Sequence, residues 1–383
     1  MCVVCDTIYF EGVFVMGRSI GYCSSDWSVD IAKNDYVYPL IPNGCTWYRM
    51  YLPSKELFKY GWSSRLGITG WNDNIGFVAG DGVGDTTHLN DVSDVIVFKL
   101  IMYRPFLDRI YRAKALGQKI VVDVDDWFKD IPKSNAAYER TDPLVFPSNN
   151  RDIYEQIIFA ADAVVCSTQF LYDYYSSVRD NVFIVRNGVD LKRFAVYKHS
   201  DSWNPTIGWV GMTPWRANDL EECSWMNDFL LKNDLRFHHA GDNPNHKRSI
   251  ETMMGLDAGL VSKSPTVSTQ MVGQLYDNMD IGIVPLSDHV FNHSKSFLKG
   301  LEYAASGIPF VASWSPEYQF LADAGVGRVA RSQDEWEYHL SELFDPDLRA
   351  AEAALNLKIV KDKFSMHIRG KEWNKVFQKI VSL

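Results

Sequence analysis

Short apolar runs separated by amphipathic segments recur along most of this chain. Apolar runs of roughly four to eight residues that end in turn residues are typical of buried strands in a parallel sheet. Apolar residues at helical spacing indicate the helices between them. In the first half, this pattern predicts strands over residues 36–41, 94–100, 119–124, 163–167 and 182–185. It predicts helices over residues 48–58, 104–116, 151–161 and 169–177.

A second series of the same kind follows a polar stretch near residue 200. Strands are predicted over residues 206–211, 235–241, 281–284, 310–312 and 327–330, and helices over 220–231, 271–278, 334–343, 347–364 and 366–381. Two such series predict an α/β protein with two Rossmann-like, doubly wound domains that face a cleft. We place the first domain at residues 1–195, with 1–34 as an irregular extension. The second spans 204–383, and its C-terminal helices include a last one that can pack back on the first domain.

Composition and charge exclude several classes of protein. Hydrophobic residues make up 46% of the chain and charged residues 23%, as in ordinary globular proteins. The net charge of −9 argues against a surface that grips nucleic acid all over. We find no apolar run long enough for a membrane span and no secretory signal, so we expect a cytoplasmic protein. Cys2 and Cys5 form a C-x-x-C, but without a second pair we expect reduced thiols and no metal.

The stretch 280–313 contains the most informative chemistry. It is interpreted as strand, polar loop, helix and strand, with the helix beginning near Ser294 to Ser296. Ligands of open α/β sheets bind outside the carboxyl ends of strands, often at the N-terminus of the next helix. There, free amides, hydroxyls and Lys295 suit a diphosphate, while Glu302 suits a sugar diol.

The first domain offers candidates at two of its predicted strand ends. Gly44 stands in a turn after the strand 36–41, and Arg49 follows near the front of the next helix, either as an anion contact or as a surface cation. Asp125 and Asp126 follow the strand 119–124. A carboxylate there either orients a hydroxyl and accepts its proton or caps the following turn.

Several motifs together resemble the retaining GT-B glycosyltransferases of family four, in the branch common in bacterial and phage genomes. The motifs are NGVDLKRF at 187–194, TIGWVG at 206–211, DIGIVPL at 280–286, KSFLKGLEYAASGIPFVAS at 295–313, GCTWYRMYLP at 44–53 and VVDVDDWF at 121–128. The resemblance covers the chain from about residue 36 to its end. It implies a GT-B fold and retaining transfer of a sugar from a nucleotide-diphosphate donor such as a UDP-sugar.

The resemblance also implies roles for individual residues. Donor-binding positions are Gly211, Thr213, Arg216, Ser294, Lys295, Ser296, Lys299 and Glu302, the catalytic candidates are Asp125 and Asp126, and Gly44 and Arg49 face the acceptor or the cleft. Family members commonly carry two glutamates eight positions apart, and Ser294 stands where the first is expected. Asp123-Val-Asp125 matches a metal-binding D-x-D of the other main glycosyltransferase fold, but the remaining motifs favour a site without metal or other cofactor.

Two alternatives stay open at this point. The chain can be a phage-type transferase acting on a modified DNA base or a virion protein, which requires a basic groove lined by lysines and arginines of residues 99–151. The loss of a glutamate at Ser294 is also compatible with a non-catalytic nucleotide-sugar-binding protein. The sequence determines neither the donor base and sugar nor the acceptor, which can be a glycan, a lipid-linked sugar, a protein or a modified DNA base.

Overall fold

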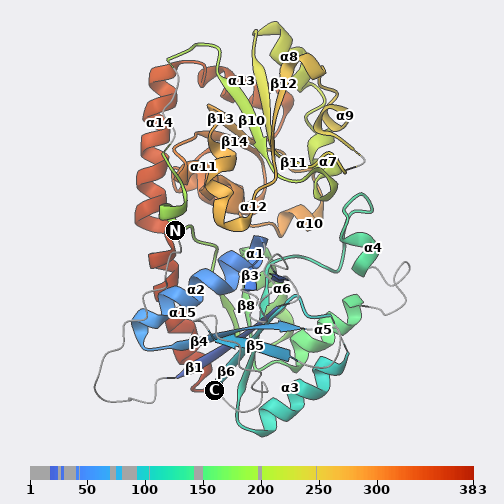
Figure 1. Ribbon diagram of the computed structural model, residues 1–383, viewed down its shortest axis with the longest axis vertical. Coiled ribbons are helices and arrows are strands. Elements are labelled where there is room, and N and C mark those ends of the chain that lie inside the picture. The colour runs from blue at the N-terminus through green and yellow to red at the C-terminus, as the bar shows by residue number, and fades with distance from the viewer. Residues whose placement is uncertain are drawn as a thin grey trace.

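The protein is described here by a computed structural model covering residues 18–24, 27–29, 40–42, 44–69, 75–79, 93–102, 104–141, 150–196, 201–246 and 248–383. Two α/β domains lie one above the other, the first drawn in blue to green and the second mainly in yellow to red (Figure 1). Each is built on its own sheet, and a third sheet has two short antiparallel strands, β2 (Trp27–Val29) and β3 (Leu40–Pro42).

The first domain contains a seven-stranded sheet in the order β5-β4-β1-β6-β7-β8-β9. Its strands are β1 (Ser19–Ser24), β4 (Ser63–Thr69), β5 (Ile75–Ala79), β6 (Val95–Lys99), β7 (Lys119–Val124), β8 (Ala163–Cys166) and β9 (Val182–Ile184). Neighbouring strands are parallel except for the antiparallel pair β4 and β5. The helices are α1 (Gly44–Thr46), α2 (Leu52–Leu57), α3 (Pro105–Ala115), α4 (Tyr138–Thr141), α5 (Asn150–Ala160) and α6 (Gln169–Val178), with a π-helical turn at Trp47–Tyr51 joining α1 to α2.

The second domain contains a six-stranded parallel sheet in the order β12-β11-β10-β13-β14-β15. Its strands are β10 (Thr206–Val210), β11 (Arg236–Asp242), β12 (Val261–Pro265), β13 (Ile281–Val284), β14 (Phe310–Ser313) and β15 (Arg328–Ala330). The helices are α7 (Ala217–Glu221), α8 (Met226–Lys232), α9 (Ile250–Met254), α10 (Val290–His293), α11 (Leu298–Ala305), α12 (Pro316–Asp323), α13 (Gln333–Glu342), α14 (Pro346–Ile359) and α15 (Met366–Ile380).

The start of the first domain differs from the prediction. Residues 19–24 belong to the expected irregular extension, yet β1 lies inside the sheet between β4 and β6. Its sequence SIGYCS contains few branched apolar residues, so it does not stand out as a buried strand. The predicted core strand 36–41 is also wrong where it is described, because Leu40–Pro42 pairs only with β2. The Asn43 turn residue and the C-x-x-C at the N-terminus lie outside the described residues.

Elements of the second domain were also misjudged. The predicted helix 220–231 is interrupted between α7 and α8, and the predicted helix 271–278 is a 3-10 segment at Thr269–Tyr276. The edge strand β12 was missed because its sequence VSKSP is mostly polar and exposed. The other strands and helices predicted for this domain are present, with ends shifted by a few residues.

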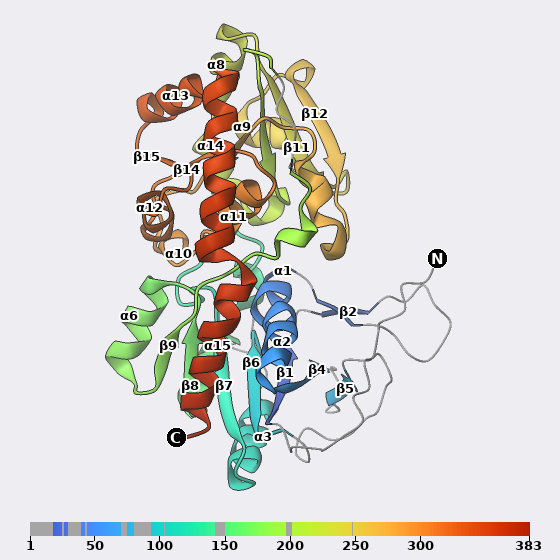
Figure 2. The same cartoon turned by 90° about the vertical axis from the view of Figure 1, so that its left-hand side faces the viewer.

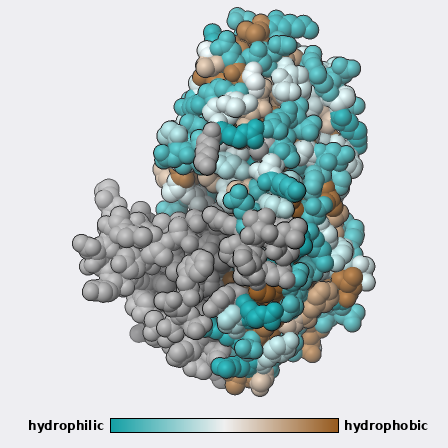
Figure 3. All heavy atoms as spheres, turned by 90° about the vertical axis from the view of Figure 1, so that its right-hand side faces the viewer, coloured by the Kyte–Doolittle hydropathy of each residue, from teal (hydrophilic) through white to brown (hydrophobic). Residues whose placement is uncertain are grey.

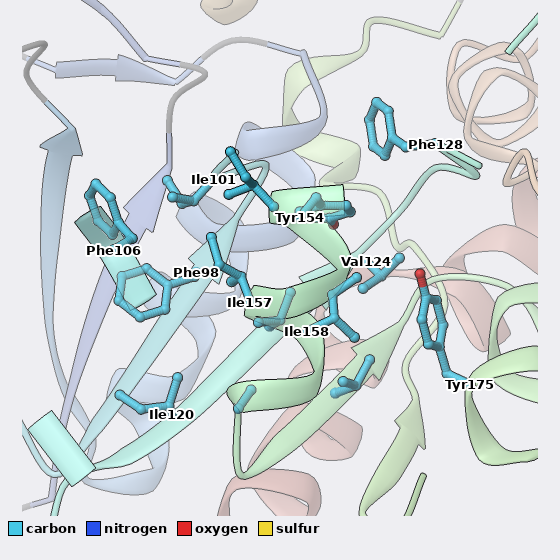
Figure 4. Packing of buried hydrophobic residues seen from close by; sticks show 14 of the residues in the cluster. Phe98, Ile101, Phe106, Ile120, Val124, Phe128, Tyr154, Ile157, Ile158 and Tyr175 are labelled. Carbon is cyan, nitrogen blue, oxygen red and sulfur yellow. The ribbon is translucent and has the colours of Figure 1, made fainter. Parts of the chain in front are cut away.

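In the two large sheets, buried apolar side chains pack on both faces of the central strands. In β6 neighbouring residues point to opposite faces, so Ile96 and Phe98 join one core cluster while Val97 joins another. Figure 4 shows the first cluster, where Phe98 and Ile120 from the strands face Ile157 from α5. This burial on both faces explains why these strands are continuous apolar runs without alternation.

The chain returns to the first domain at its C-terminus. The helix α14 runs alongside the second domain, and α15 runs alongside the first, in both ribbon views (Figures 1 and 2). Trp373, Phe377 and Ile380 of α15 belong to the same buried cluster as Ile20 and Val97 of the first sheet. The last helix therefore completes the core of the domain in which the chain begins.

Side-chain caps fix the start of several helices near the cleft. Thr168 accepts a hydrogen bond from the Leu171 amide at α6, and Ser315 accepts one from the Tyr318 amide at α12. Such caps satisfy amides that have no partner within the helix. On the face drawn in Figure 3 the coloured side chains are mostly hydrophilic, and hydrophobic ones gather only in small groups. Among the described helices, none is both long and apolar enough to cross a bilayer.

Candidate active site

A cavity of about 430 Å³ lies between the two domains. From the second domain it is lined by the end of β10, by residues 284–286 after β13, and by residues 295–302 around the start of α11. From the first domain it is lined by Gly44 and by Asp125 and Asp126 after β7. The carboxyl ends of parallel strands from both sheets therefore meet at one site, as expected for ligand binding in this class of fold.

Most of the predicted site residues line this cavity. They are Gly44, Asp125, Asp126, Gly211, Arg216, Lys295, Ser296, Lys299 and Glu302. Gly44 has a φ of +34° at the start of α1, a conformation that suits glycine, as the predicted turn requires. Arg49, Thr213 and Ser294 are buried and are not among the lining residues.

Glu302 is the most buried acid of the cavity, with 4% of its surface exposed. Its Oε1 accepts a hydrogen bond of 2.5 Å from the Tyr48 hydroxyl, and its Oε2 accepts bonds from Tyr276 at 2.7 Å and from Lys299 at 3.0 Å. Burial raises the pKa of this carboxyl, but the charge of Lys299 and the tyrosine hydrogen bonds outweigh it, so the pKa lies below its usual value. Glu302 is therefore an ionised acceptor at neutral pH.

Asp125 is also held in its ionised form. Lys99 at the end of β6 lies 3.0 Å from its Oδ2, and both side chains are buried. Burial raises the pKa of Asp125, but the charge of Lys99 and its hydrogen bond outweigh this effect, so the pKa lies below its usual value. The carboxylate faces the cavity beside Cys45, which contributes a further hydrogen bond that lowers the same pKa.

Arg216 is anchored by a hub at Asp219. Asp219 Oδ2 lies 3.3 Å from the Arg216 guanidinium, while its Oδ1 accepts hydrogen bonds from the Ser287 amide and from the Asn292 side chain. This one carboxylate thus ties the loop after β10 to the segment that precedes Lys295. Both loops lie at the carboxyl edge of the second sheet, where a diphosphate is expected.

Two glycines allow the backbone to come close at the same edge. Gly211 has a φ of +157° and Gly241 a φ of +102°, and an added Cβ at Gly241 would lie 2.9 Å from the Gly211 carbonyl oxygen. His239 bonds that oxygen through Nε2 at 3.0 Å and lies against Trp209, which lines the cavity. At this edge the cavity is therefore lined by glycine backbone and by the Trp209 side chain.

Arg49 does not face the cleft, so that prediction is wrong. Its side chain is fully buried and forms an ion pair of 2.6 Å with Asp123. The guanidinium also donates to the Val185 carbonyl at 2.5 Å and to Asn187 Oδ1 at 3.2 Å, and it lies 5.0 Å from the ring centre of Trp373. Arg49 therefore joins β7, the loop after β9 and α15 inside the first domain.

The predicted start of the donor helix is also wrong. α11 begins at Leu298 after Phe297, which makes no side-chain cap. Ser294 is completely buried at the end of α10, where its hydroxyl donates to the Phe291 carbonyl at 2.7 Å. Thr213 is likewise committed to the Arg248 carbonyl at 2.9 Å. Neither hydroxyl is available to a ligand in this arrangement.

The structure adds cavity residues that sequence analysis missed. Tyr48, Asn187 and Arg193 line the cavity from the first domain. The Asn187 amide donates to Ser296 Oγ at 2.8 Å, which joins the two domains. All three belong to motifs already quoted, but the sequence alone does not show that their side chains lie beside residues of the second domain. The described residues contain no group of three or more His, Cys, Asp and Glu side chains that could hold a metal ion.

No family model matches this sequence, and no curated protein sequence matches it significantly. A glycosyltransferase from Rickettsia africae matches the structure with a TM-score of 0.63 at 12% identity, covering 95% of this chain and 99% of that one. Sucrose-phosphate synthase from Thermosynechococcus elongatus matches with a TM-score of 0.61 at 12% identity, covering 95% of this chain and 99% of that one. HepE from Anabaena, solved with UDP-glucose, matches with a TM-score of 0.59 at 12% identity, covering 95% of this chain and 100% of that one. These likenesses confirm the predicted GT-B fold.

Proposed function

We propose that this protein is a glycosyltransferase that moves a sugar from a nucleotide-diphosphate donor to an acceptor hydroxyl. The observation that carries the proposal is the interdomain cavity, where the ionised Glu302 shares a wall with Lys295, Lys299 and Arg216. A carboxylate accepts a hydrogen bond from a sugar hydroxyl, and clustered cations suit a diphosphate. The likeness to HepE, which was solved with UDP and with UDP-glucose, supports a uridine nucleotide as the first donor to test.

In this proposal the second domain holds the donor. Gly211, Arg216, Lys295 and Ser296 contact the diphosphate, while Lys299 and Glu302 face the ribose. The cations stabilise the negative charge that develops on the leaving diphosphate, so no metal or other cofactor is required. Ser294 is excluded from direct contact by its burial, and Thr213 supports the loop from behind.

The first domain supplies the acceptor side. Asp125 and Asp126 reach the cavity after β7, and the ionised Asp125 is suited to orient a hydroxyl of the acceptor or of the sugar. We propose transfer with retention of the anomeric configuration, as the family-four resemblance implies. A front-face path requires only that the acceptor and the leaving diphosphate are held on the same side of the sugar.

A DNA acceptor would need the basic groove predicted from residues 99–151, but three of the five lysines in that range already have a carboxylate partner. Lys99 is buried against Asp125, and Lys114 and Lys129 form ion pairs of 3.0 and 2.9 Å with Asp162 and Glu155. These lysines are neutralised within the fold and do not form a row of unpaired charge. We therefore propose an acceptor hydroxyl on a glycan, a lipid-linked sugar or a protein.

Donor hydrolysis tests the proposal. The protein is incubated with UDP-, GDP- and ADP-sugars, and release of the nucleoside diphosphate is followed with and without candidate acceptors. We expect slow hydrolysis of one donor, faster release with the right acceptor, and an α-linked product from an α-linked donor by proton NMR. Binding without any release would identify a non-catalytic nucleotide-sugar-binding protein. Neither binding nor hydrolysis of any donor would refute the proposal.

A further inference from the structure

The cavity contains a cation that no carboxylate neutralises. Arg193, at the end of the 3-10 turn Leu191–Arg193 in the first domain, lines the cavity, and within the described parts of the chain no Asp or Glu lies at ion-pair distance from it. By contrast, Lys295, Lys299 and Arg216 each pair with an acid. The Arg193 guanidinium lies 4.3 Å from the ring centre of Trp47, donates to the Thr269 carbonyl, and has a buried Nε without a hydrogen-bond partner.

Arg193 connects to Glu302 through one tyrosine. Its Nη1 donates to the Tyr48 hydroxyl at 3.2 Å, and that hydroxyl donates to Glu302 at 2.5 Å. The direction is fixed, because arginine only donates and because burial and the Glu302 charge raise the pKa of Tyr48 well above its usual value. Bonds linked in this way polarise one another. This relay of two hydrogen bonds, from Arg193 to Tyr48 and from Tyr48 to Glu302, runs from the first domain to the second.

The relay limits what Glu302 can still accept. Each carboxylate oxygen accepts about two hydrogen bonds. Oε2 already accepts from Tyr276 and Lys299, while Oε1 accepts, among the described residues, only from Tyr48. One acceptor position therefore remains, on Oε1, and it belongs to the oxygen whose orientation Tyr48 fixes.

We propose that Tyr48 and Arg193 are positioning residues of the donor site, which orient Glu302 so that it takes a single ribose hydroxyl. The inference rests on the proposed function, because it assumes that the ribose of a nucleotide meets Glu302. It makes ribose recognition depend on both domains, since Tyr48 belongs to the first and Glu302 to the second. It also predicts that one ribose hydroxyl contributes much more to binding than the other.

Deoxynucleotides separate this role from a general effect on the fold. UDP, GDP and ADP are first ranked by calorimetry, and the tightest binder is then compared with its 2′-deoxy and 3′-deoxy forms. For the wild-type protein we expect one deoxy form to bind about 10-fold or more weakly and the other within about threefold, since a hydrogen bond to a charged group is worth about 1.5–3 kcal/mol. In Tyr48→Phe we expect the larger difference to shrink to about threefold or less.

Matched variants keep the test decisive. Tyr175→Phe removes a hydroxyl that bonds Glu155 at 2.9 Å outside the cavity, and it should leave the deoxy ratios unchanged. Arg193→Lys keeps the charge but loses the guanidinium that bonds both Tyr48 and Thr269. It should therefore reduce the ratio between the dissociation constants of the two deoxynucleotides, as Tyr48→Phe does. Two variants at different positions keep the test usable if one of them folds poorly. The inference is overturned if both variants keep the wild-type ratio of deoxynucleotide affinities, or if the wild type loses equal affinity for the two deoxy forms. Either result leaves the proposed function standing. Failure of the wild type to bind any nucleotide refutes the proposed function itself.

Discussion

Lys295 of the second domain and Asp126 of the first form an ion pair across the cavity, with 2.5 Å between Nζ and Oδ1. Both side chains are partly exposed, and the Lys295 ammonium lies 4.1 Å from the ring centre of Phe291. The predicted phosphate-binding lysine is thus neutralised by a predicted catalytic carboxylate. In the proposed function a donor diphosphate competes with Asp126 for this lysine, which links donor binding to the first domain.

Removing the carboxylate should strengthen nucleotide binding. Asp126→Asn keeps the shape of the side chain but frees the Lys295 charge, so we expect the affinity for UDP at low salt to rise by about twofold to fivefold. A partly exposed ion pair is worth up to about 1 kcal/mol, which sets this range. Asp130→Asn is the matched control, because Asp130 lies in the same loop but does not line the cavity. An affinity that is unchanged or lower in Asp126→Asn would contradict this view of the pair.

The buried pair of Arg49 and Asp123 should be costly to break. Arg49→Ala leaves the Asp123 carboxylate buried without its partner, and such losses cost about 3–5 kcal/mol. We expect the free energy of unfolding in urea to fall by that amount. Asp123→Ala should be similarly destabilising, whereas the double variant should lose clearly less than the sum of the two, because it leaves no unpaired charge. Additive losses would show that the two residues act independently.

Arg49 also shows where sequence analysis reaches its limit. The pattern places it near the front of a helix after the strand 36–41, but that strand is not part of the core sheet, and the partner of Arg49, Asp123, was seen only as part of a possible metal motif. Whether an arginine points into a cleft or a core depends on side-chain direction within a π-helical turn, which spacing does not reveal. By contrast, Lys295 and Glu302 belong to the segment that joins β13 to β14, and the carboxyl edge of the sheet places that segment at the cavity.

The stability that Glu302 contributes should depend on pH. Because its folded pKa is below its usual value, the unfolded chain binds the proton more tightly, and the contribution is complete above about pH 4.3. It is lost as pH falls through the depressed folded pKa. We compare the wild type with Glu302→Gln in urea from pH 6 to pH 3 and expect the wild-type advantage to shrink at the acid end. Glu221→Gln, at a largely exposed glutamate, is the control, and an advantage that grows toward acid would contradict the assignment.

A further link between the domains, between Glu317 and Arg186, gives another prediction. Glu317 in the first turn of α12 is 1% exposed, and its carboxylate lies 3.0 Å from Arg186 after β9. The same carboxylate accepts a bond of 2.9 Å from the Gln169 amide at the start of α6, where a negative charge also complements the helix dipole. Arg186 further lies 4.1 Å from the ring centre of Phe320 on α12. One glutamate of the second domain thus caps a helix of the first.

Arg186→Ala should loosen the domains without unfolding either one. It leaves Glu317 buried and short of its main partner, so we expect interdomain docking to lose about 2–4 kcal/mol. Small-angle scattering should then show a larger radius of gyration without nucleotide, and an added donor should restore the wild-type value by closing the cavity. Arg331→Ala is the matched control, because Arg331 stacks on Trp314 and bonds Gln319 within the second domain. Equal radii for Arg186→Ala and the wild type, with the same melting temperature, would show that the Glu317 contact does not hold the domains together.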